Sequence, residues 1–142
     1  MNVAYHYTGC FVDAAALLAR APAMGPDRLG RLIRHPHVTF AYRPESVDEG
    51  LFGTPVTLRV TGYGCDGKNE GFRVEVLADC APLAQQAAAI EVPHITLSVG
   101  VEEQAVNTRW LVFAPVEPFE IESVYGGYLD GIPRFSPQSA GE

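Results

Sequence analysis

The sequence predicts an α+β fold of bilobal type, in which two pseudo-symmetric antiparallel sheets line a central cleft and helices lie on the outside. Runs of alternating polar and apolar residues, typical of strands, are separated by alanine-rich runs typical of helices. The order strand, helix, strand also occurs twice, over residues 3–8, 13–33 and 37–43 and again over 71–78, 81–91 and 94–100. Residue identity between the two halves is otherwise low, so the repeat is a structural inference.

In the first half, residues 3–8 are β-branched and aromatic enough for a strand, and Asp13 has the side chain of a helix N-cap. Prolines and a glycine over 22–26 should end that helix. A short second helix is expected over 27–34, and 37–43 alternates as a strand.

In the second half, 55–61 and 71–78 both alternate and are expected to form a hairpin. The residues between them include Gly-Tyr-Gly-Cys-Asp-Gly at 62–67, which matches the G-x-G-x-x-G pattern of dinucleotide loops. A strand and not a helix follows, so these glycines are expected to serve the hairpin turn. A helix over 81–91 and a strand over 94–100 come next. One more strand is expected over 119–125.

The size and composition predict one domain over residues 1–135, followed by a disordered tail over 136–142. The chain has 142 residues, of which 47% are hydrophobic and 19% charged. No apolar run approaches the ~20 residues of a membrane span, and the N-terminus lacks the pattern of a signal peptide. We therefore expect a cytoplasmic protein that does not contact a membrane.

Charge and cysteine usage favour a small ligand. The net charge is -7, from 10 Lys and Arg against 17 Asp and Glu, which disfavours binding to a long nucleic acid because such affinity depends on basic surface. The three cysteines, Cys10, Cys65 and Cys80, are far apart and form no C-x-x-C pair. They predict neither a disulfide framework nor a zinc knuckle, and are expected to be buried thiols.

The most informative feature is a short motif that occurs once in each half, in "HPHVTFAY" at 35–42 and in "VPHITLS" at 92–98. Both contain proline, histidine, an aliphatic residue, threonine and an apolar residue in that order. Because strand side chains alternate, His37 and Thr39 share one face, as do His94 and Thr96. If the two halves pair about a pseudo-twofold axis, two imidazoles and two hydroxyls meet in one cleft.

Two H-x-[ST]-x motifs, one on a strand of each lobe, are the signature of the 2H phosphoesterases, and the chain resembles this family in element order over nearly its whole length. The specific residues of this resemblance are His37, Thr39, His94 and Thr96. The resemblance implies a bilobal fold and metal-independent cleavage of a phosphodiester beside a ribose hydroxyl, or opening of a cyclic phosphate, without a cofactor.

Members of the family process RNA 2',3'-cyclic ends, nucleotide cyclic phosphates or, in phage-encoded versions, the cyclic oligonucleotide signals of antiviral defence. The short length and acidic charge are more similar to the last two groups. The resemblance therefore favours a small nucleotide or cyclic oligonucleotide as the substrate. RNA-end processing is the alternative.

The chemistry of the four motif residues agrees with such a reaction. An imidazole has a pKa near ~6.5, so one histidine can be the general base and the other the general acid. The base would deprotonate water or a 2'-hydroxyl, and the acid would protonate the leaving oxygen. The hydroxyls of Thr39 and Thr96 would donate to the nonbridging oxygens. Nothing in the sequence distinguishes the roles of the two histidines.

Further residues are candidates for substrate binding. Arg43 shares the face of His37 and Thr39 and could contact phosphate. Aromatic side chains beside a phosphate site can stack on a nucleobase. The aromatic candidates are Tyr5, Tyr7, Trp110, Tyr125 and Tyr128.

Other interpretations stay open at this point. Each motif taken singly is typical of a solvated sheet face. His35, His37 and His94 could together bind zinc and leave a position for a catalytic water, although this leaves both threonines unexplained. A protein that sequesters nucleotides without cleaving them is a third possibility. Our prediction is a metal-independent enzyme.

Overall fold

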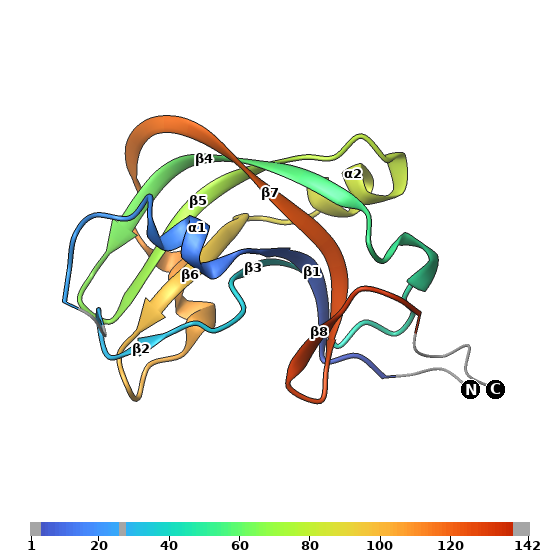
Figure 1. The fold of residues 1–142 in the computed structure, drawn as a ribbon, viewed down its shortest axis with the longest axis horizontal. Helices are drawn as coiled ribbons and strands as arrows, with labels where there is room; N and C mark the ends of the chain where they lie inside the picture. Colours follow the sequence, from blue (N-terminus) through green and yellow to red (C-terminus); the bar gives the residue numbers. More distant parts are fainter. Residues whose placement is uncertain (1–3, 26–27, 138–142) are drawn as a thin grey trace.

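The computed structural model describes residues 4–25 and 28–137, and the strands in these ranges form one antiparallel sheet (Figure 1). The strand order is β2-β6-β5-β4-β7-β1-β3, and β8 pairs with β7 beside this path. The strands are β1 (Tyr7–Val12), β2 (Arg31–Leu32), β3 (His37–Tyr42), β4 (Pro55–Cys65), β5 (Asn69–Leu77), β6 (His94–Val99), β7 (Ala114–Leu129) and β8 (Ile132–Arg134).

The prediction of two separate sheets is wrong for the described residues, which contain a single sheet of eight strands. The cause is β7, which is 16 residues long and pairs with β1 along one edge and with β4 along the other. Its backbone N–H and C=O groups therefore join the two halves in one hydrogen-bonded ladder.

Helices are few and short, so the chain is mostly β. The α-helices are α1 (Ala14–Leu18) and α2 (Ala81–Ala88), and the 3-10 helices are η1 (Glu49–Leu51) and η2 (Ala105–Trp110). Asp13 caps α1 as predicted, because its carboxylate accepts a hydrogen bond of 2.9 Å from the Ala16 backbone N–H. Pro82 lies in the first turn of α2, also as predicted. None of the helices in residues 4–25 and 28–137 has the length and hydrophobicity needed to cross a membrane.

The strand order is symmetric about the boundary between β4 and β7. Outward from it, β7, β1 and β3 in one half correspond to β4, β5 and β6 in the other. The symmetry extends to a register shift immediately before Gly9 in β1 and immediately before Gly71 in β5. A Cβ at Gly9 would collide with the backbone carbonyl of Val38, and a Cβ at Gly71 would collide with that of Ile95. Both positions therefore require glycine. The order strand, helix, strand that was predicted for each half is observed as β1, α1 and β3, with the short β2 inserted, and as β5, α2 and β6.

The first half departs from the prediction in two places. The strand expected over 3–8 lies at Tyr7–Val12, where it pairs with both β3 and β7. The helix expected over 27–34 is not formed over residues 28–34. There, Arg28 and Gly30 have φ angles of 50° and 141°, outside the range of a right-handed helix, and β2 pairs with β6. Residues 26–27 lie outside the described residues.

Elsewhere the local predictions are confirmed more closely. The hairpin of β4 and β5 includes the 62–67 glycines in the end of its first strand and in its turn. Of the three cysteines, Cys10 is buried as expected, Cys80 is half-buried, and Cys65 is exposed because it ends β4 at the turn. Of the predicted tail, residues 138–142 lie outside the described residues.

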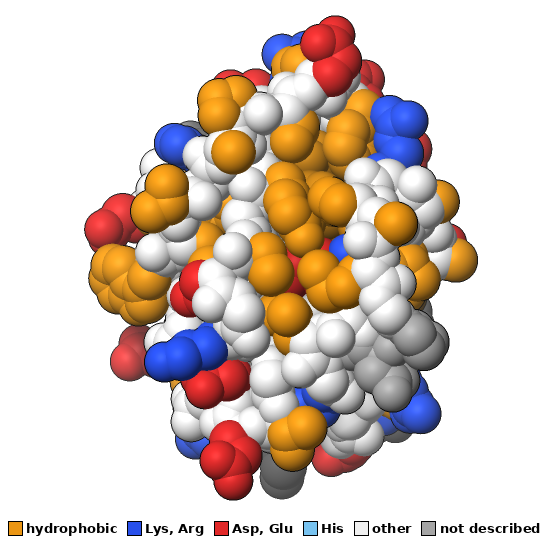
Figure 2. Space-filling view, turned by 90° about the vertical axis from the view of Figure 1, so that its left-hand side faces the viewer, with side chains coloured by type: hydrophobic (Ala, Val, Ile, Leu, Met, Phe, Trp, Pro, Cys, Tyr) orange, Lys and Arg blue, Asp and Glu red, His pale blue; other side chains and the backbone are white. Residues whose placement is uncertain are grey.

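The core contains apolar residues from both halves of the sheet and one fully buried leucine from each α-helix, Leu17 and Leu83. Hydrophobic side chains also gather around a hollow on the face shown in Figure 2. A cavity of about 550 Å³ contacts residues 19–22, Tyr63 and residues 116–119, and none of the motif residues contacts it.

Candidate functional site

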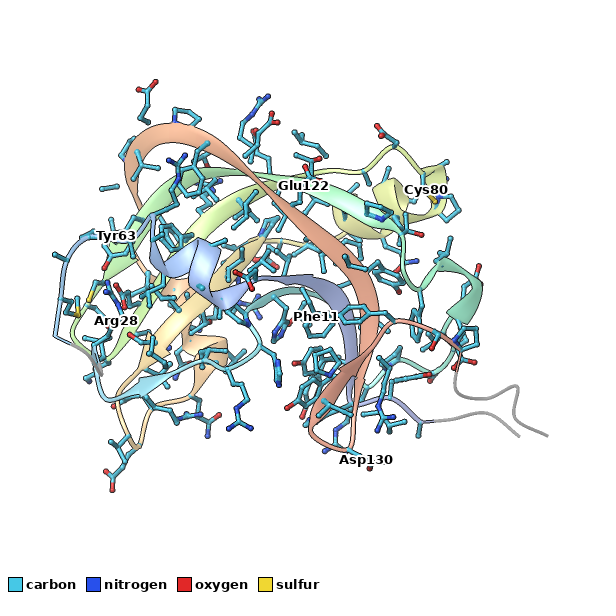
Figure 3. All side chains as sticks on the ribbon, viewed as in Figure 1. Phe11, Arg28, Tyr63, Cys80, Glu122 and Asp130 are labelled. Atoms are coloured by element: carbon cyan, nitrogen blue, oxygen red, sulfur yellow. The ribbon has the colours of Figure 1, made fainter. Side chains whose placement is uncertain are left out.

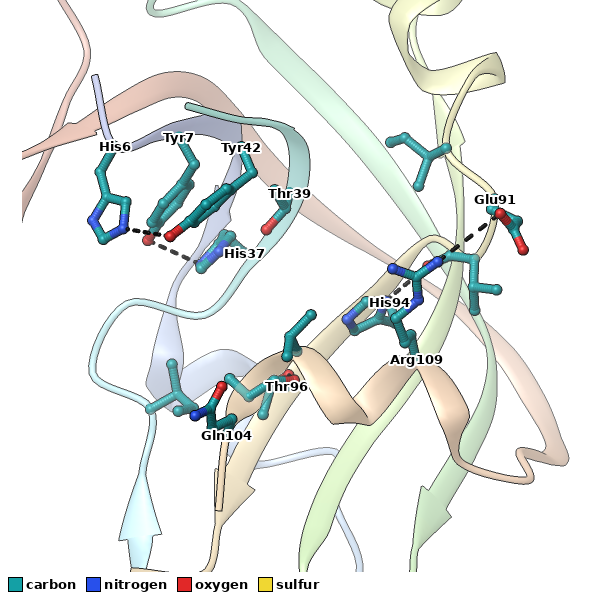
Figure 4. A pocket seen from close by; sticks show the side chains of 15 residues that line it. His6, Tyr7, His37, Thr39, Tyr42, Glu91, His94, Thr96, Gln104 and Arg109 are labelled. Carbon is teal, nitrogen blue, oxygen red and sulfur yellow. Dashed lines mark hydrogen bonds and ion pairs between the residues drawn. The ribbon is translucent and has the colours of Figure 1, made fainter. Parts of the chain in front are cut away.

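The motif strands β3 and β6 lie close to one another, although four strands separate them along the sheet. The sheet therefore curls, and a cavity of about 660 Å³ lies between these two strands (Figure 4). This volume is within the ~300–1,000 Å³ typical of small-molecule sites. The side chains of His37, Thr39, His94 and Thr96 all line this cavity.

Both imidazoles are oriented by the same hydrogen bond. The Nδ1 atom of His37 lies 2.9 Å from the backbone carbonyl oxygen of His35, and Nδ1 of His94 lies 2.7 Å from that of Val92. A carbonyl oxygen can only accept, so Nδ1 carries the proton in each ring and Nε2 is left to exchange protons. The accepting carbonyl belongs to the residue before the proline in each motif, so the proline helps to set this geometry.

Both histidines are neutral at pH 7 in the free protein. The pKa of His37 is lowered to about 4, mainly by burial and also by the nearby His94 and His35, against a raising effect of the hydrogen bond to the His35 carbonyl. Burial also lowers the pKa of His94, and the positive charge of Arg109 lowers it too. A phosphate anion between the two rings would raise both pKa values, because it stabilises the protonated form.

The first half supports its histidine with aromatic rings. The rings of Tyr7 and His37 stack with centroids 4.3 Å apart and planes 18° apart, and Tyr7 also stacks on Tyr128 at 4.7 Å and 10°. Two parallel rings so close to Tyr7 must lie on its opposite faces. Tyr7 therefore packs against His37 and supports its position. Neither face of the Tyr7 ring is free for the nucleobase stacking that the sequence suggested.

The other aromatic candidates lie outside the cavity. Tyr5 and Tyr125 are core residues, 4% and 2% exposed, because Tyr5 turns inward before β1 and Tyr125 lies on the inner face of β7. Trp110 is 70% exposed but does not line the cavity. Tyr128 contributes to the stack behind His37. The predicted contact of these four rings with substrate in this cavity is therefore not supported by their positions.

Arg43 also lies away from the cavity. It follows the last residue of β3 with φ of 47°, so the alternation that would place it beside Thr39 ends before it. Its guanidinium lies 5.5 Å from the ring centroid of Tyr42. Tyr42 itself, which the sequence analysis did not single out, lines the cavity with its ring 64% exposed.

The two threonines differ in their hydrogen bonds. The Thr39 hydroxyl has no hydrogen-bond partner among the described residues, and it faces the cavity (Figure 4). The Thr96 hydroxyl lies 3.1 Å from the Ala105 carbonyl oxygen and 2.8 Å from Oγ1 of Thr108, both in η2. A hydroxyl has one proton, so that of Thr96 is already engaged in holding η2.

Arg109 is a second residue of the cavity that sequence reasoning missed. It is carried by η2, lines the cavity beside His94, and lies 3.9 Å from the Glu91 carboxylate (Figure 4). Among the residues that line the cavity it is the single lysine or arginine. A 3-10 helix this short has no periodic pattern of polar and apolar residues in the sequence, so only the fold brings Arg109 to the site.

The zinc triad considered from the sequence is not assembled in the described residues. They contain no group of three His, Cys, Asp or Glu side chains placed to hold a metal ion. His35 contributes its backbone carbonyl to His37, and its side chain does not line the cavity.

No family model matches the sequence, and no curated protein matches it either. The resemblance to the 2H phosphoesterases thus rests on the two motifs and on element order. The function must be argued from the cavity itself.

Proposed function

We propose that the protein is a phosphodiesterase of the 2H type that acts on a small cyclic nucleotide or cyclic oligonucleotide. The observation that carries this proposal is the pair of imidazoles, His37 and His94, which line one cavity from facing strands with their Nδ1 atoms held by backbone carbonyls. Displacement at phosphorus needs one proton removed from the nucleophile and one delivered to the leaving group. Two separate imidazoles with free Nε2 atoms are suited to this.

The pKa values suggest a division of roles. The pKa of His37 is lowered to about 4, mainly by burial, so this imidazole is neutral in the free protein and is suited to be the base. Its Nε2 would take the proton of a water or of a ribose 2'-hydroxyl as the oxygen of that group bonds to phosphorus. A bound phosphate raises the pKa of His94, so that its Nε2 also binds a proton, and Nε2–H would then give this proton to the leaving oxygen as the P–O bond breaks.

Thr39 is better placed than Thr96 to stabilise the transition state. Its hydroxyl has no partner within residues 4–25 and 28–137 and can donate to a nonbridging oxygen, where negative charge increases. Thr96 instead positions η2. This revises the equivalent roles that the two motifs suggest from the sequence.

The size and charge of the site favour a small substrate. A cavity of about 660 Å³ encloses a nucleotide-sized ligand, and a chain of net charge -7 offers little basic surface to a long strand. A nucleotide-sequestering protein is the rival function, but binding alone does not require two titrating imidazoles with free Nε2 atoms.

A turnover assay tests the proposal directly. The protein is incubated with 2',3'-cyclic mononucleotides, short RNA ends and cyclic di- and trinucleotides, and products are identified by mass spectrometry. We expect cleavage of a cyclic substrate that persists in excess EDTA. Loss of activity in EDTA with rescue by zinc would contradict the two-histidine mechanism, tight binding without turnover would favour sequestration, and a preference for RNA ends would favour the alternative branch.

Variants then assign the activity to this cavity. His37→Ala and His94→Ala should each lose on the order of 10²-fold or more in turnover, and the double variant should be scarcely worse, because the two groups act in one step. His35→Ala is the matched control, since the carbonyl that binds His37 is retained and the side chain lies outside the cavity. Full activity in either single variant at 37 or 94 would remove that residue from the mechanism.

A further inference from the structure

The charged groups of the cavity form one loose pair. Among the described residues that line it, Arg109 is the single lysine or arginine and Glu91 the single acidic residue. The two charged groups are 3.9 Å apart, and the side chains are 34% and 80% exposed. An exposed ion pair of this kind contributes only ~0–1 kcal/mol. The guanidinium can therefore leave Glu91 at small cost.

The backbone that carries Arg109 is, in contrast, firmly held. Thr108, the preceding residue, is fully buried, and its Oγ1 accepts hydrogen bonds from Thr96 and, at 3.1 Å, from the side-chain amide of Asn69. The amide of Asn69 also donates to the Gln104 carbonyl at 2.8 Å. These contacts fix η2 against β5 and β6, so Arg109 is presented to the cavity from a rigid support.

The guanidinium is also the main source of attraction for an anion. Burial lowers the pKa of both His37 and His94, which disfavours their charged forms, and among the described lining residues Arg109 is the one lysine or arginine, opposed by the carboxylate of Glu91. A guanidinium offers N–H donors in a planar fork that matches two oxygens of a phosphate.

We propose that Arg109 captures the phosphate group of the ligand by exchanging Glu91 for phosphate oxygens, and that Glu91 competes with the ligand and so sets its affinity. The ligand class is a small phosphate ester, and the assignment of this ester as a substrate rests on the proposed function. The capture itself requires no bond to break. Arg109 is thus a specificity-determining residue of the cavity.

Titration with inorganic phosphate tests this exchange without any turnover. Binding is followed by NMR of the imidazole resonances at constant ionic strength in the wild type, Arg109→Gln, Arg109→Lys and Glu91→Gln. We expect Arg109→Gln to weaken binding by roughly 10-fold or more, as for loss of a hydrogen bond to a charged group. Arg109→Lys should recover part of the loss, and Glu91→Gln should tighten binding by roughly 2- to 5-fold, because it removes the competitor.

Arg59→Gln is the matched control for loss of one exposed positive charge. Arg59 lies on β4 outside the cavity and also faces carboxylates, with Glu120 at 3.4 Å and Glu75 at 3.7 Å. We expect its affinity for phosphate to equal that of the wild type. An Arg109→Gln protein that still melts cooperatively confirms that the fold is retained.

Three results would overturn the inference: no perturbation of the wild type by phosphate, an unchanged affinity in Arg109→Gln, or weaker binding in Glu91→Gln. The last would show that the ion pair is needed to build the site. If phosphate binds as expected but no nucleotide is cleaved, the proposed function fails and this inference stands. If nucleotides are cleaved while Arg109→Gln binds phosphate normally, only this inference fails.

Discussion

The two halves of the sheet carry the same His-Thr pair on corresponding strands, but they surround it differently. In the half built from β1 and β3, His37 stacks on Tyr7 and the Thr39 hydroxyl is without a partner among the described residues. In the half built from β5 and β6, His94 lies beside Arg109 and the Thr96 hydroxyl binds η2. A repeated backbone therefore does not require repeated chemistry, and the difference supports the separate roles proposed for the two halves.

The difference continues behind the motif strands. The residue before the glycine at the register shift is Thr8 in β1 and Glu70 in β5, and both are buried. Glu70 accepts hydrogen bonds from Arg28 Nε at 2.7 Å, from Ser98 Oγ at 2.6 Å and from the Tyr63 hydroxyl. Burial raises the pKa of Glu70, but these hydrogen bonds lower it by more. Arg28 and Tyr63 lie at the same end of the sheet (Figure 3).

The largest expected contrast between the halves is in stability. Glu70→Gln leaves the Arg28 guanidinium, 5% exposed, without a counter-charge, and should lower the free energy of unfolding by about 3–5 kcal/mol. Thr8→Val removes only a neutral hydroxyl and should cost about 1 kcal/mol. Urea denaturation at pH 7 measures both. Equal losses would mean that the buried ion pair does not distinguish the halves.

A second contrast concerns how acid changes the free energy of unfolding. The pKa of His37 is about 4 in the folded protein and ~6.5 in an unfolded chain, so between these values the unfolded chain binds more protons. The free energy of unfolding should thus fall as the pH is lowered from about 6.5 to 4, with His37 contributing about 3 kcal/mol at most. His94 contributes in the same direction.

Urea denaturation of the wild type and of His37→Gln at pH 7 and at about pH 4.5 measures this contribution. The variant should lose less stability on acidification than the wild type, because it lacks the imidazole whose pKa is lowered by folding. His35→Gln is the control and should lose nearly as much stability on acidification as the wild type does, because His35 is the last of the causes that lower the pKa of His37. If all three proteins lose the same stability, another group causes the acid sensitivity.

The smallest contrast separates the two threonines. Thr39→Val should lower kcat by roughly 10- to 100-fold with little change in melting temperature, because its hydroxyl serves the transition state alone. Thr96→Val breaks buried hydrogen bonds to η2 and should cost about 1–2 kcal/mol in stability. Thr→Ser at either position keeps the hydroxyl and should restore most of each loss. Identical effects on kcat and on stability would indicate that the threonines are equivalent after all.

The elements that could be predicted from sequence are those with strong local signals. The strand over 37–43 and the strand over 94–100 alternate in polarity, and Asp13 caps its helix through its own side chain. The helix expected over 27–34 is not formed over residues 28–34, because contacts with distant parts of the chain outweigh the local preference. Its local composition is compatible with a helix, but the pairing of β2 with β6 and the burial of Arg28 against Glu70 stabilise an irregular backbone instead.

The sequence by itself determined that each half carries a histidine and a threonine on one strand face, because a period of two needs no information beyond the neighbouring residues. Only the tertiary structure decided that both pairs line one cavity, that Thr96 is bound to η2, and that Arg109 joins the site. The tertiary structure also places Tyr5, Tyr125 and Arg43 outside the cavity. These outcomes depend on contacts between segments distant in the chain, and the free energy of such contacts is set by burial and hydrogen bonding that no local pattern encodes.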